Sequence, residues 1–521
     1  MGELPILTLI TFLPLAGAVV LLFLPRGGLG LLRGWTLFVT LLTFALSLPL
    51  WFGFDNGEGG MQFVERAPWI ESLGIQYLLG IDGISLFLVL LTTFLSVICI
   101  LSSWSIEKQV REYMFFFLLL ETGMLGALVA LDLFLFYIFW EAMLIPMYFL
   151  IGVWGGAERI YAAIKFFLYT MVGSLLMLVA ILTLYFLNIK AGYGATFDVL
   201  RLYDLPIAPN VQFWLFAAFA LAFAIKVPMF PLHTWLPDAH TQAPTAGSVI
   251  LAGVLLKMGT YGFLRFAIPL FPNAAEAFAP FMMVLAVIGI IYGALVAMVQ
   301  SDVKKLVAYS SVSHLGFVML GLFAFNIQGV EGGIFQSLAH GVSTGALFLL
   351  VGVIYERRHT REIAQFGGLA KQMPWYAAIF VVITMSSIGL PGLNGFVGEF
   401  LIMVGAFLAS KTAAVFAASG VILAAGYMLW MVLRVFFGPL DNEKNKGLAD
   451  LTGLEWAYLV PMVVLAFWMG IYPAVFLRPM DASVQQWLER VESRRVACAE
   501  LGHQDAVALI LGREPSRSAA E

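Results

Sequence analysis

The chain has 521 residues, of which 61% are hydrophobic and 12% charged, and its net charge is −4 at pH 7. With a mean hydropathy of +0.94, this composition lies far outside the range of soluble domains and indicates a membrane protein with many spans. The small charge is spread over loops, so it indicates neither nucleic-acid binding nor a charged membrane-surface patch. Two cysteines cannot supply the four thiolates of an iron–sulfur cluster. Glycine-rich motifs for dinucleotides or nucleoside triphosphates do not occur, so we expect this chain to bind no cofactor and no metal ion itself.

Windows of about 20 apolar residues, the length that spans a bilayer, predict an all-α protein with about fourteen transmembrane helices. In chain order, the predicted spans cover residues 4–24, 31–52, 84–103, 113–131, 133–154, 162–189, 209–229, 244–268, 277–299, 303–325, 331–355, 375–410, 413–437 and 455–477. Pro228 and Pro231 interrupt the seventh span, and the sequence from Pro391 to Gly395 interrupts the twelfth. Broken helices at membrane depth are tolerated where the freed backbone is buried in protein or lines a wet cavity, so both breaks predict a functional site.

The distribution of Lys and Arg predicts the orientation in the membrane. Fourteen basic residues fall in one set of loops: Arg26, Arg33, Lys108, Arg111, Arg159, Lys304, Lys305, Arg357, Arg358, Arg361, Lys371, Arg434, Lys444 and Lys446. The opposite loops hold Arg66, Lys190, Arg201 and Lys411. We therefore expect the first set on the cytoplasmic side of a bacterial inner membrane and, with an even number of spans, both termini outside. No basic residue precedes Arg26, so the first span is expected to be retained rather than cleaved as a signal.

Two parts of the chain share a common offset. Three pairs of ionisable residues have nearly the same separation: Lys226 and Glu399 (173), Glu141 and His314 (173), and Asp132 and Asp302 (170). The tetrad Val-Ile-Leu-Ala at 249–252 recurs at 421–424, an offset of 172. We interpret this as a duplication of five helices, and an odd number of helices inverts the second copy in the membrane.

The predicted organisation follows from the spans and the repeat. It comprises residues 1–112 with helices 1–3, residues 113–268 as the first five-helix repeat with helices 4–8, residues 277–437 as the second, inverted repeat with helices 9–13, residues 455–477 as the last helix, and residues 478–521 as a polar tail. In the tail, Val484, Trp487, Leu488 and Val491 follow helical spacing, which predicts an amphipathic helix lying along the membrane surface.

Six ionisable residues lie inside predicted spans: Glu141, Lys226, Lys257, His314, His340 and Glu399. A charge at the bilayer centre costs about 2.5–3.5 kcal/mol or more, so such residues mark a functional pathway by default. The alternatives are a static salt bridge between Glu141 and Lys226, an ammonium of Lys257 that reaches the interface, and histidines that only pack. Buried ion pairs add little net stability, and Lys257 lies near the middle of its span. We predict that opening or closing the Glu141–Lys226 pair switches Lys226 between holding and releasing a proton.

Three residues near the cytoplasmic ends of the spans are weaker candidates for proton uptake: His233, His240 and Lys305. The alternative for the two histidines is loop and helix-cap chemistry. Lys304 and Lys305 are interpreted as positive-inside anchors. The alternative for Lys305 is a position at a channel mouth.

Four stretches carry a family resemblance: Pro231–Ser248, with Lys226 before it and Lys257 after it, Leu79–Ser85, Phe139–Glu141 and Ser310–Gly316. They resemble the signature sequences of the antiporter-like subunits of respiratory complex I and of the Mrp antiporters, and the resemblance covers residues 75–475. Within that family the chain is similar to the M type, because Glu399 stands in the twelfth helix where the sibling L and N types have a lysine. The tail beyond about residue 480 is longer than in the family.

The resemblance implies a proton-translocating membrane subunit of NADH:quinone oxidoreductase, with L-type and N-type subunits as neighbours and with FMN and iron–sulfur clusters in partner subunits. It implies that Lys226 receives protons, that Lys257 is the central relay and that Glu399 releases protons outward, with His314 and His340 between them. Two alternatives remain open: a cation/proton antiporter subunit of the Mrp type, and a structural membrane anchor in a hydrogenase-like complex.

Overall fold

The computed structural model describes residues 4–510, with side chains described as far as residue 499. The helices, in chain order, are α1 (Ile6–Phe23), α2 (Leu29–Phe52), α3 (Leu86–Ser102), α4 (Val110–Val129), α5 (Leu133–Ala142), α6 (Leu144–Trp154), α7 (Arg159–Lys190), α8 (Val199–Leu202), α9 (Pro209–Lys226), α10 (Trp235–Gln242), α11 (Thr245–Ile250), α12 (Leu256–Gly262), α13 (Ile268–Leu270), α14 (Pro272–Met298), α15 (Val303–Leu322), α16 (Ile327–Arg358), α17 (Pro374–Ser387), α18 (Asn394–Ala409), α19 (Lys411–Phe436), α20 (Gly453–Ile471) and α21 (Ala474–Ile510). The strands are β1 (Gln62–Ile70) and β2 (Ile75–Ile81).

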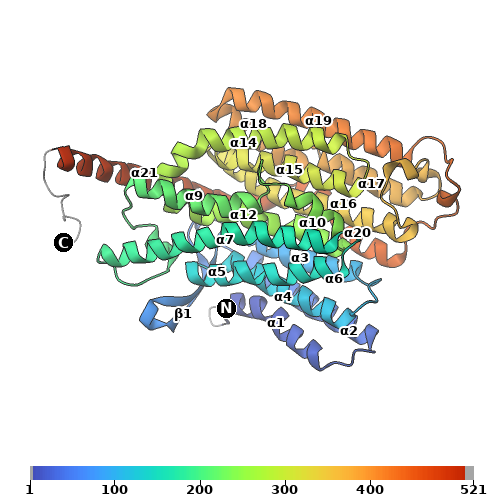
Figure 1. Ribbon diagram of the computed structural model, residues 1–521, viewed down its shortest axis with the longest axis horizontal. Coiled ribbons are helices and arrows are strands. Elements are labelled where there is room, and N and C mark those ends of the chain that lie inside the picture. The colour runs from blue at the N-terminus through green and yellow to red at the C-terminus, as the bar shows by residue number, and fades with distance from the viewer. Residues whose placement is uncertain (1–3, 511–521) are drawn as a thin grey trace.

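The long helices lie side by side along one direction (Figure 1), as expected for a bundle that crosses a membrane. Within residues 4–510, twelve helical segments are long and apolar enough to span a bilayer. They match all the predicted spans except the third and the twelfth, which correspond to the shorter apolar helix α3 and to the pair α17 and α18. The polytopic helical class is therefore confirmed, whereas the total of fourteen spans stays a prediction.

The two ends of the bundle differ in chemistry. At one end, here called the basic end, Lys108 donates to the carbonyl of Val153 and Arg361 to that of Thr241. At the other end, here called the hairpin end, β1 and β2 form an antiparallel hairpin (Figure 1). The hairpin is absent from the all-α expectation, because a short pair of strands leaves little signal beside long apolar helices.

The eighth span runs from Thr245 to Leu270 and is buried over its whole apolar window. Since it has no lipid-facing side, it needs no amphipathic pattern, and its apolar residues surround the buried Lys257 and Arg265. Two π-helical segments, Leu251–Leu255 and Phe263–Ala267, interrupt it on either side of α12. Such wider turns leave some backbone carbonyls without their usual intrahelical partner, which makes them available to side chains.

Both predicted helix breaks are present. α9 ends at Lys226, and regular helix resumes only with α10 at Trp235. α17 ends at Ser387, and α18 begins at Asn394. Each break leaves a titratable residue, Lys226 or Glu399, buried within the first two turns of a helix end.

Two backbone bridges repeat one hydrogen-bond pattern. Asp132 caps α5 by accepting from the second and third residues after it, and Asp302 caps α15 in the same way. Each aspartate is also bridged to a distant strand-like residue, Asp198 in the first case and Glu362 in the second. The same local geometry at an offset of 170 residues supports the predicted duplication.

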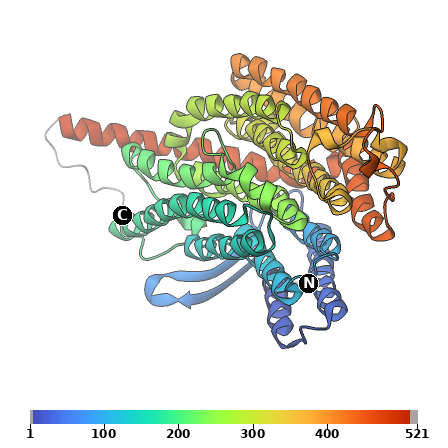
Figure 2. The same ribbon diagram turned by 45° about the vertical axis from the view of Figure 1, so that its right-hand side comes forward.

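The C-terminal helix α21 is one long element that crosses the bundle at the hairpin end (Figure 2). It contacts α9, α13, α14 and α16. It buries its own Val484, Trp487 and Val491, which agrees with the amphipathic spacing of the tail. The helix is longer than the short one expected, because it starts at Ala474 immediately after α20.

Candidate functional site

Lys257 lies on α12 in the middle of the molecule and is 1% exposed. Its ammonium group donates to the carbonyl oxygen of Ala252, in the first π-helical segment, and its Nζ lies 2.6 Å from Nδ1 of His340 on α16. The cation is thus held by one backbone carbonyl and one imidazole. Within residues 4–499, no carboxylate lies within ion-pair distance of it. A buried charge without a counter-ion is costly, so this site is suited to a lysine that gains and loses its proton reversibly.

A second cluster surrounds Glu399 on α18. Its Oε1 lies 3.0 Å from Nδ1 of His314 on α15 and accepts a hydrogen bond of 3.2 Å from Nε2 of Gln336 on α16. The other ring nitrogen of His314 lies 3.3 Å from Oγ of Ser387, the last residue of α17. Four helices thus contribute to this cluster. The helices on the two sides of the second break, α17 and α18, both contact the imidazole of His314, through Ser387 and Glu399.

The two clusters meet at the histidine rings. The ring centroids of His314 and His340 are 5.7 Å apart. A polar cavity of about 10 Å³ lies beside both rings and is also lined by Gln336, Ser343 and Ser387. A single water molecule needs about 10–15 Å³. Lys257, His340, His314 and Glu399 therefore form a row of buried titratable side chains, in which the only step without a direct polar contact, between the two imidazoles, adjoins a space of about one water molecule.

Lys226 is the last residue of α9 and is 2% exposed. Its Nζ lies over the rings of Trp140, at 5.1 Å, and Phe166, at 5.7 Å. Trp140 Nε1 donates to Oγ of Ser174 at 2.9 Å, which fixes the ring under the cation. The aromatic faces supply the favourable electrostatics that a carboxylate would otherwise give.

The predicted contact between Glu141 and Lys226 is not closed in this structure. Among the described residues the two side chains form no ion pair, and Oε1 of Glu141 has no hydrogen-bond partner. Glu141 follows Trp140 on α5, and successive helical residues point about 100° apart, so the ring and the carboxylate approach Lys226 from different directions. The structure thus holds Lys226 by the ring, with the carboxylate nearby and unpartnered.

Lys226 and Lys257 lie on helices that touch. Gly259, two residues after Lys257, packs against the end of α9: a Cβ at this position would lie only 2.7 Å from the carbonyl oxygen of Phe223. Any side chain at Gly259 would therefore push α12 away from α9. Lys257, two residues earlier, projects from the other side of α12 towards His340, so α12 separates its ammonium from the end of α9.

At the basic end, His240 on α10 is 0% exposed and stacks on Phe348 at 4.5 Å. Neither of its ring nitrogens has a hydrogen-bond partner among the described residues. A cavity of about 220 Å³ reaches the adjoining turn at Gln242 and is lined by Lys304, Glu356 and Arg361 among others. His240 thus lies two residues from a side chain that lines a polar opening.

Lys304, rather than Lys305, lines this cavity. Its side chain is buried, and Nζ donates to the carbonyl oxygen of Ala243 at 2.6 Å. Lys305 contributes its backbone N–H to the cap made by Asp302. Lys304 is therefore the lysine that lines this opening, and the role of Lys305 at a channel mouth stays a prediction.

His233 lies apart from the row. Its ring packs against Phe230 and Tyr292, with centroids 5.8 and 5.2 Å away, and neither nitrogen is hydrogen-bonded within the described part of the chain. Near it, Lys165 forms an ion pair of 2.7 Å with Asp238. His233 therefore keeps only the weaker role of a candidate for proton uptake.

Several buried polar groups escaped the sequence analysis. Gln336 precedes His340 by four residues on α16, so helical spacing could have placed both on one face. Arg265 and Asp82 form a buried ion pair of 2.5 Å between the eighth span and the start of α3. No local signal relates these two residues, which are 183 positions apart. Within the described residues, no cluster of three or more His, Cys, Asp or Glu is arranged to hold a metal ion.

Comparison with known proteins places this arrangement in a family. Residues 130–424 match the family described as NADH:quinone oxidoreductase/Mrp antiporter, transmembrane. NADH-quinone oxidoreductase subunit M of Rhodobacter capsulatus is 53% identical over 496 residues, which cover 92% of this chain and 95% of the relative. A chain of respiratory complex I from Thermus thermophilus superposes with a TM-score of 0.85 at 36% identity, over 93% of this chain and 99% of that one. A chain of the Mrp complex from Dietzia shares the fold, with a TM-score of 0.80 at 22% identity over 95% and 99% of the two chains.

Proposed function

Since the chain belongs to the family of antiporter-like M subunits of NADH:quinone oxidoreductase, we propose that it moves protons across the membrane along its row of buried titratable side chains. The observation that carries this proposal is the row from Lys257 through His340 and His314 to Glu399, with contacts of 2.6 and 3.0 Å at its two ends. Proton transfer needs hydrogen-bond distances or a single bridging water, and this row meets that requirement. A packing role would not require four titratable groups in one line.

Proton uptake starts at the basic end. The cavity at Lys304 brings water to the turn beside His240, whose free ring nitrogens can take up and pass on a proton. In this proposal the basic end faces the cytoplasm, as the excess of Lys and Arg in its loops indicates. Both chain termini then lie on the periplasmic side of a bacterial inner membrane.

Lys226 acts as the gate of the row. When its ammonium is charged, it disfavours a proton on Lys257 of the adjoining helix α12, and that proton moves towards His340. When Glu141 turns towards Lys226, the carboxylate neutralises this repulsion. A conformational change at a neighbouring subunit that moves α5 would therefore couple redox work to the position of the proton.

The redox chemistry belongs to other subunits in this proposal. The chain sits between antiporter-like subunits of the L and N types, and FMN and iron–sulfur clusters are held by subunits outside the membrane arm. Glu399 delivers the proton to the periplasmic side, so net movement is from cytoplasm to periplasm.

Lys257→Met tests the proposal in the whole complex. Methionine keeps most of the side-chain volume and removes the charge, so the bundle should assemble normally. We expect NADH-driven proton pumping in sealed vesicles to be abolished and NADH:quinone turnover to fall about tenfold or more, because loss of a proton-transfer group typically costs 10²–10⁴-fold in its step. The matched control is Lys190→Met, the same change at an exposed position at the end of α7.

The two other functions predict different results. A structural anchor would lose assembled complex in Lys257→Met while keeping normal pumping per assembled complex. An Mrp-type antiporter subunit would show sodium-dependent proton movement without NADH. Full pumping in Lys257→Met, with normal assembly, would contradict the proton-transfer role itself.

A further inference from the structure

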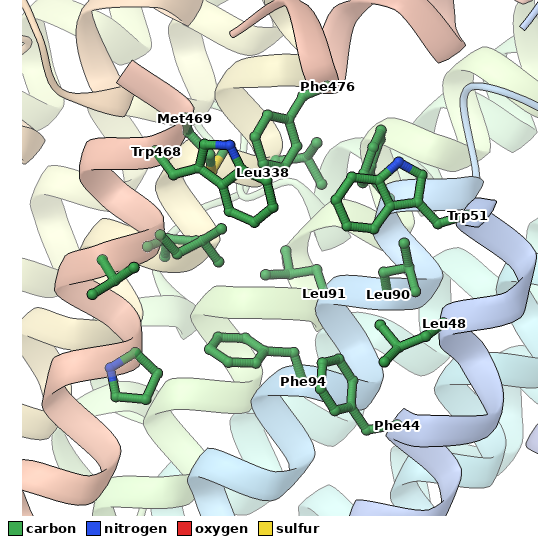
Figure 3. A pocket seen from close by; sticks show the side chains of 15 residues that line it. Phe44, Leu48, Trp51, Leu90, Leu91, Phe94, Leu338, Trp468, Met469 and Phe476 are labelled. Carbon is green, nitrogen blue, oxygen red and sulfur yellow. The ribbon is translucent and has the colours of Figure 1, made fainter. Parts of the chain in front are cut away.

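A groove lined only by apolar side chains lies on the side of the bundle away from the titratable row. It has a volume of about 270 Å³ and lies between α2 and α20, over α3 and α16. Figure 3 shows the side chains of these helices converging on one elongated space, with Trp51 and Trp468 near one end and Phe44 and Phe94 near the other. All lining residues are Leu, Val, Met, Pro, Phe or Trp.

The floor and the walls of this groove have different exposure. Leu91 on α3 and Leu338 and Val342 on α16 form the floor and are at most 7% exposed. The rim on α20 is open, with Val464 57% and Trp468 41% exposed. The groove is therefore a recess in the outer face of the bundle, and its opening faces the lipid that surrounds membrane-spanning helices.

The groove runs parallel to the helices for about two turns. Its wall residues extend from Phe44 to Trp51 on α2 and from Pro461 to Trp468 on α20. Each stretch covers seven steps along the helix, or about 10 Å at 1.5 Å per residue. One leaflet of a bilayer has a hydrocarbon depth of about 15 Å, so the groove reaches from one interface well towards the bilayer centre.

Aromatic side chains mark the interface at the upper end of the groove. The rings of Trp51 and Trp468 lie 5.8 Å apart, and those of Phe87 and Phe476 lie 5.0 Å apart. Tyr472, one turn beyond Trp468, is 62% exposed. Trp and Tyr gather at the headgroup level of membranes, so the groove begins just below the headgroups and lies wholly within the hydrocarbon region.

We propose that this groove binds one acyl chain of a membrane phospholipid, with the headgroup at the level of Trp468 and Tyr472. Its lining offers no partner for a headgroup, a quinone ring or a peptide backbone, and burying such polar groups unpaired is costly. A transmembrane helix of a neighbour is about 10–12 Å wide and does not fit a recess of this volume. A slender hydrocarbon chain fills it without leaving a void, which is how membrane-facing recesses are closed.

Photolabelling of the whole complex tests this assignment. The complex is reconstituted in nanodiscs of phosphatidylcholine that carries a diazirine in the middle of its acyl chain, illuminated and digested for mass spectrometry. We expect labelled peptides at residues 44–51, 87–94 and 461–469, at higher yield than on the exposed apolar face of α7. Phosphatidylcholine with the diazirine in its headgroup should instead label the peptide around Tyr472.

Filling the groove should remove the label. In Leu48→Trp the indole occupies the space of the acyl chain, and labelling of 87–94 and 461–469 should fall about fivefold, since packed apolar space admits no second occupant. Leu41→Trp, two turns away on the same helix and outside the groove, is the matched control and should label as the native protein does. Leu465→Trp fills the groove from α20 and repeats the test where Leu48→Trp fails to assemble. Labelling of the groove no stronger than that of α7, or unchanged by both filling variants, would overturn the proposal and leave a neighbouring subunit's side chain as the occupant.

Discussion

The contact between His314 and Glu399 gives the sharpest test of the proton row. The two side chains are joined at 3.0 Å, and both are almost completely buried, at 3% and 6% side-chain exposure. Glu399→Gln keeps the shape and the hydrogen-bonding capacity but removes the negative charge. His314→Gln keeps a polar side chain but removes the group that gains and loses a proton. The double variant completes a thermodynamic cycle.

The size of the effect follows from the hydrogen bond that is changed. A bond to a charged group contributes about 1.5–3 kcal/mol and a neutral one about 0.5–1.5 kcal/mol, so Glu399→Gln weakens the contact by about 1–1.5 kcal/mol. Because the amide also cannot take up or release a proton, we expect pumping-linked turnover to fall about tenfold or more. Loss of the imidazole in His314→Gln should cost at least as much, because no other titratable group takes over its step.

The diagnostic quantity is the pumping rate of the double variant relative to the two single variants. If both residues handle the same proton, removing the second group adds little, and the double variant stays within about twofold of the worse single variant. Independent roles would multiply to about a hundredfold loss. The rates are measured as quenching of a pH-sensitive dye in inverted vesicles, normalised to assembled complex. A multiplicative double variant, or normal pumping in either single variant, would refute the hand-over between these two side chains.

The surface ion pair Arg495–Glu276 gives the control cycle for this experiment. Its atoms lie 2.9 Å apart, much like the buried contact, but the side chains are 34% and 55% exposed. Exposed pairs are worth 0–1 kcal/mol, so Glu276→Gln and the double variant with Arg495→Gln should leave pumping unchanged.

Three further outcomes are expected. Arg265→Met should leave Asp82 as an uncompensated buried charge and destabilise the fold by about 3–5 kcal/mol, seen as a lower yield of assembled complex and a lower melting temperature; a yield equal to the native one would show that the pair is solvated. Lys304→Ala should slow proton uptake about threefold while Lys305→Ala changes it less, because only Lys304 lines the cavity, where its amine can take up a proton and pass it on; equal effects would remove Lys304 from the channel mouth. Lys226→Met should abolish pumping with normal assembly, and vesicle pumping at the native rate would eliminate the gate.

Much of the site was predictable because charges in apolar spans are rare. The helix breaks follow from Pro228 and Pro231 and from the run Pro391–Gly395, and each points to its neighbouring ionisable residue without any tertiary information. The order of residues along the row was not predictable in this way. His314 and His340 meet because α15 and α16 pack face to face, and the rotation of one helix against another is set by side-chain packing that the sequence alone does not give.

The Glu141–Lys226 pair shows that opposite charges in the sequence do not by themselves predict an ion pair in the structure. Opposite charges at similar membrane depth predict an ion pair, but the face of α5 that meets Lys226 carries Trp140 instead. The rotation of α5 decides between a carboxylate and an aromatic ring, and the two alternatives differ by one residue in register. In the proposed mechanism a change of side-chain rotamer at Glu141, or a shift of α5, closes the contact, and an Oε1 atom without a partner beside a ring-bound Lys226 is suited to such switching.

The two helix breaks differ in how they stabilise charge, and in the proposed mechanism this difference gives the row a direction. At the first break, Lys226 lies over two aromatic faces, which attract a cation and disfavour an anion. At the second, Glu399 faces an imidazole and a donating amide, which stabilise an anion. In that mechanism, a proton on Lys257 is disfavoured by the charged Lys226 and attracted towards Glu399. Direction thus follows from the solvation of the two ends, and it requires no difference in the intervening histidines.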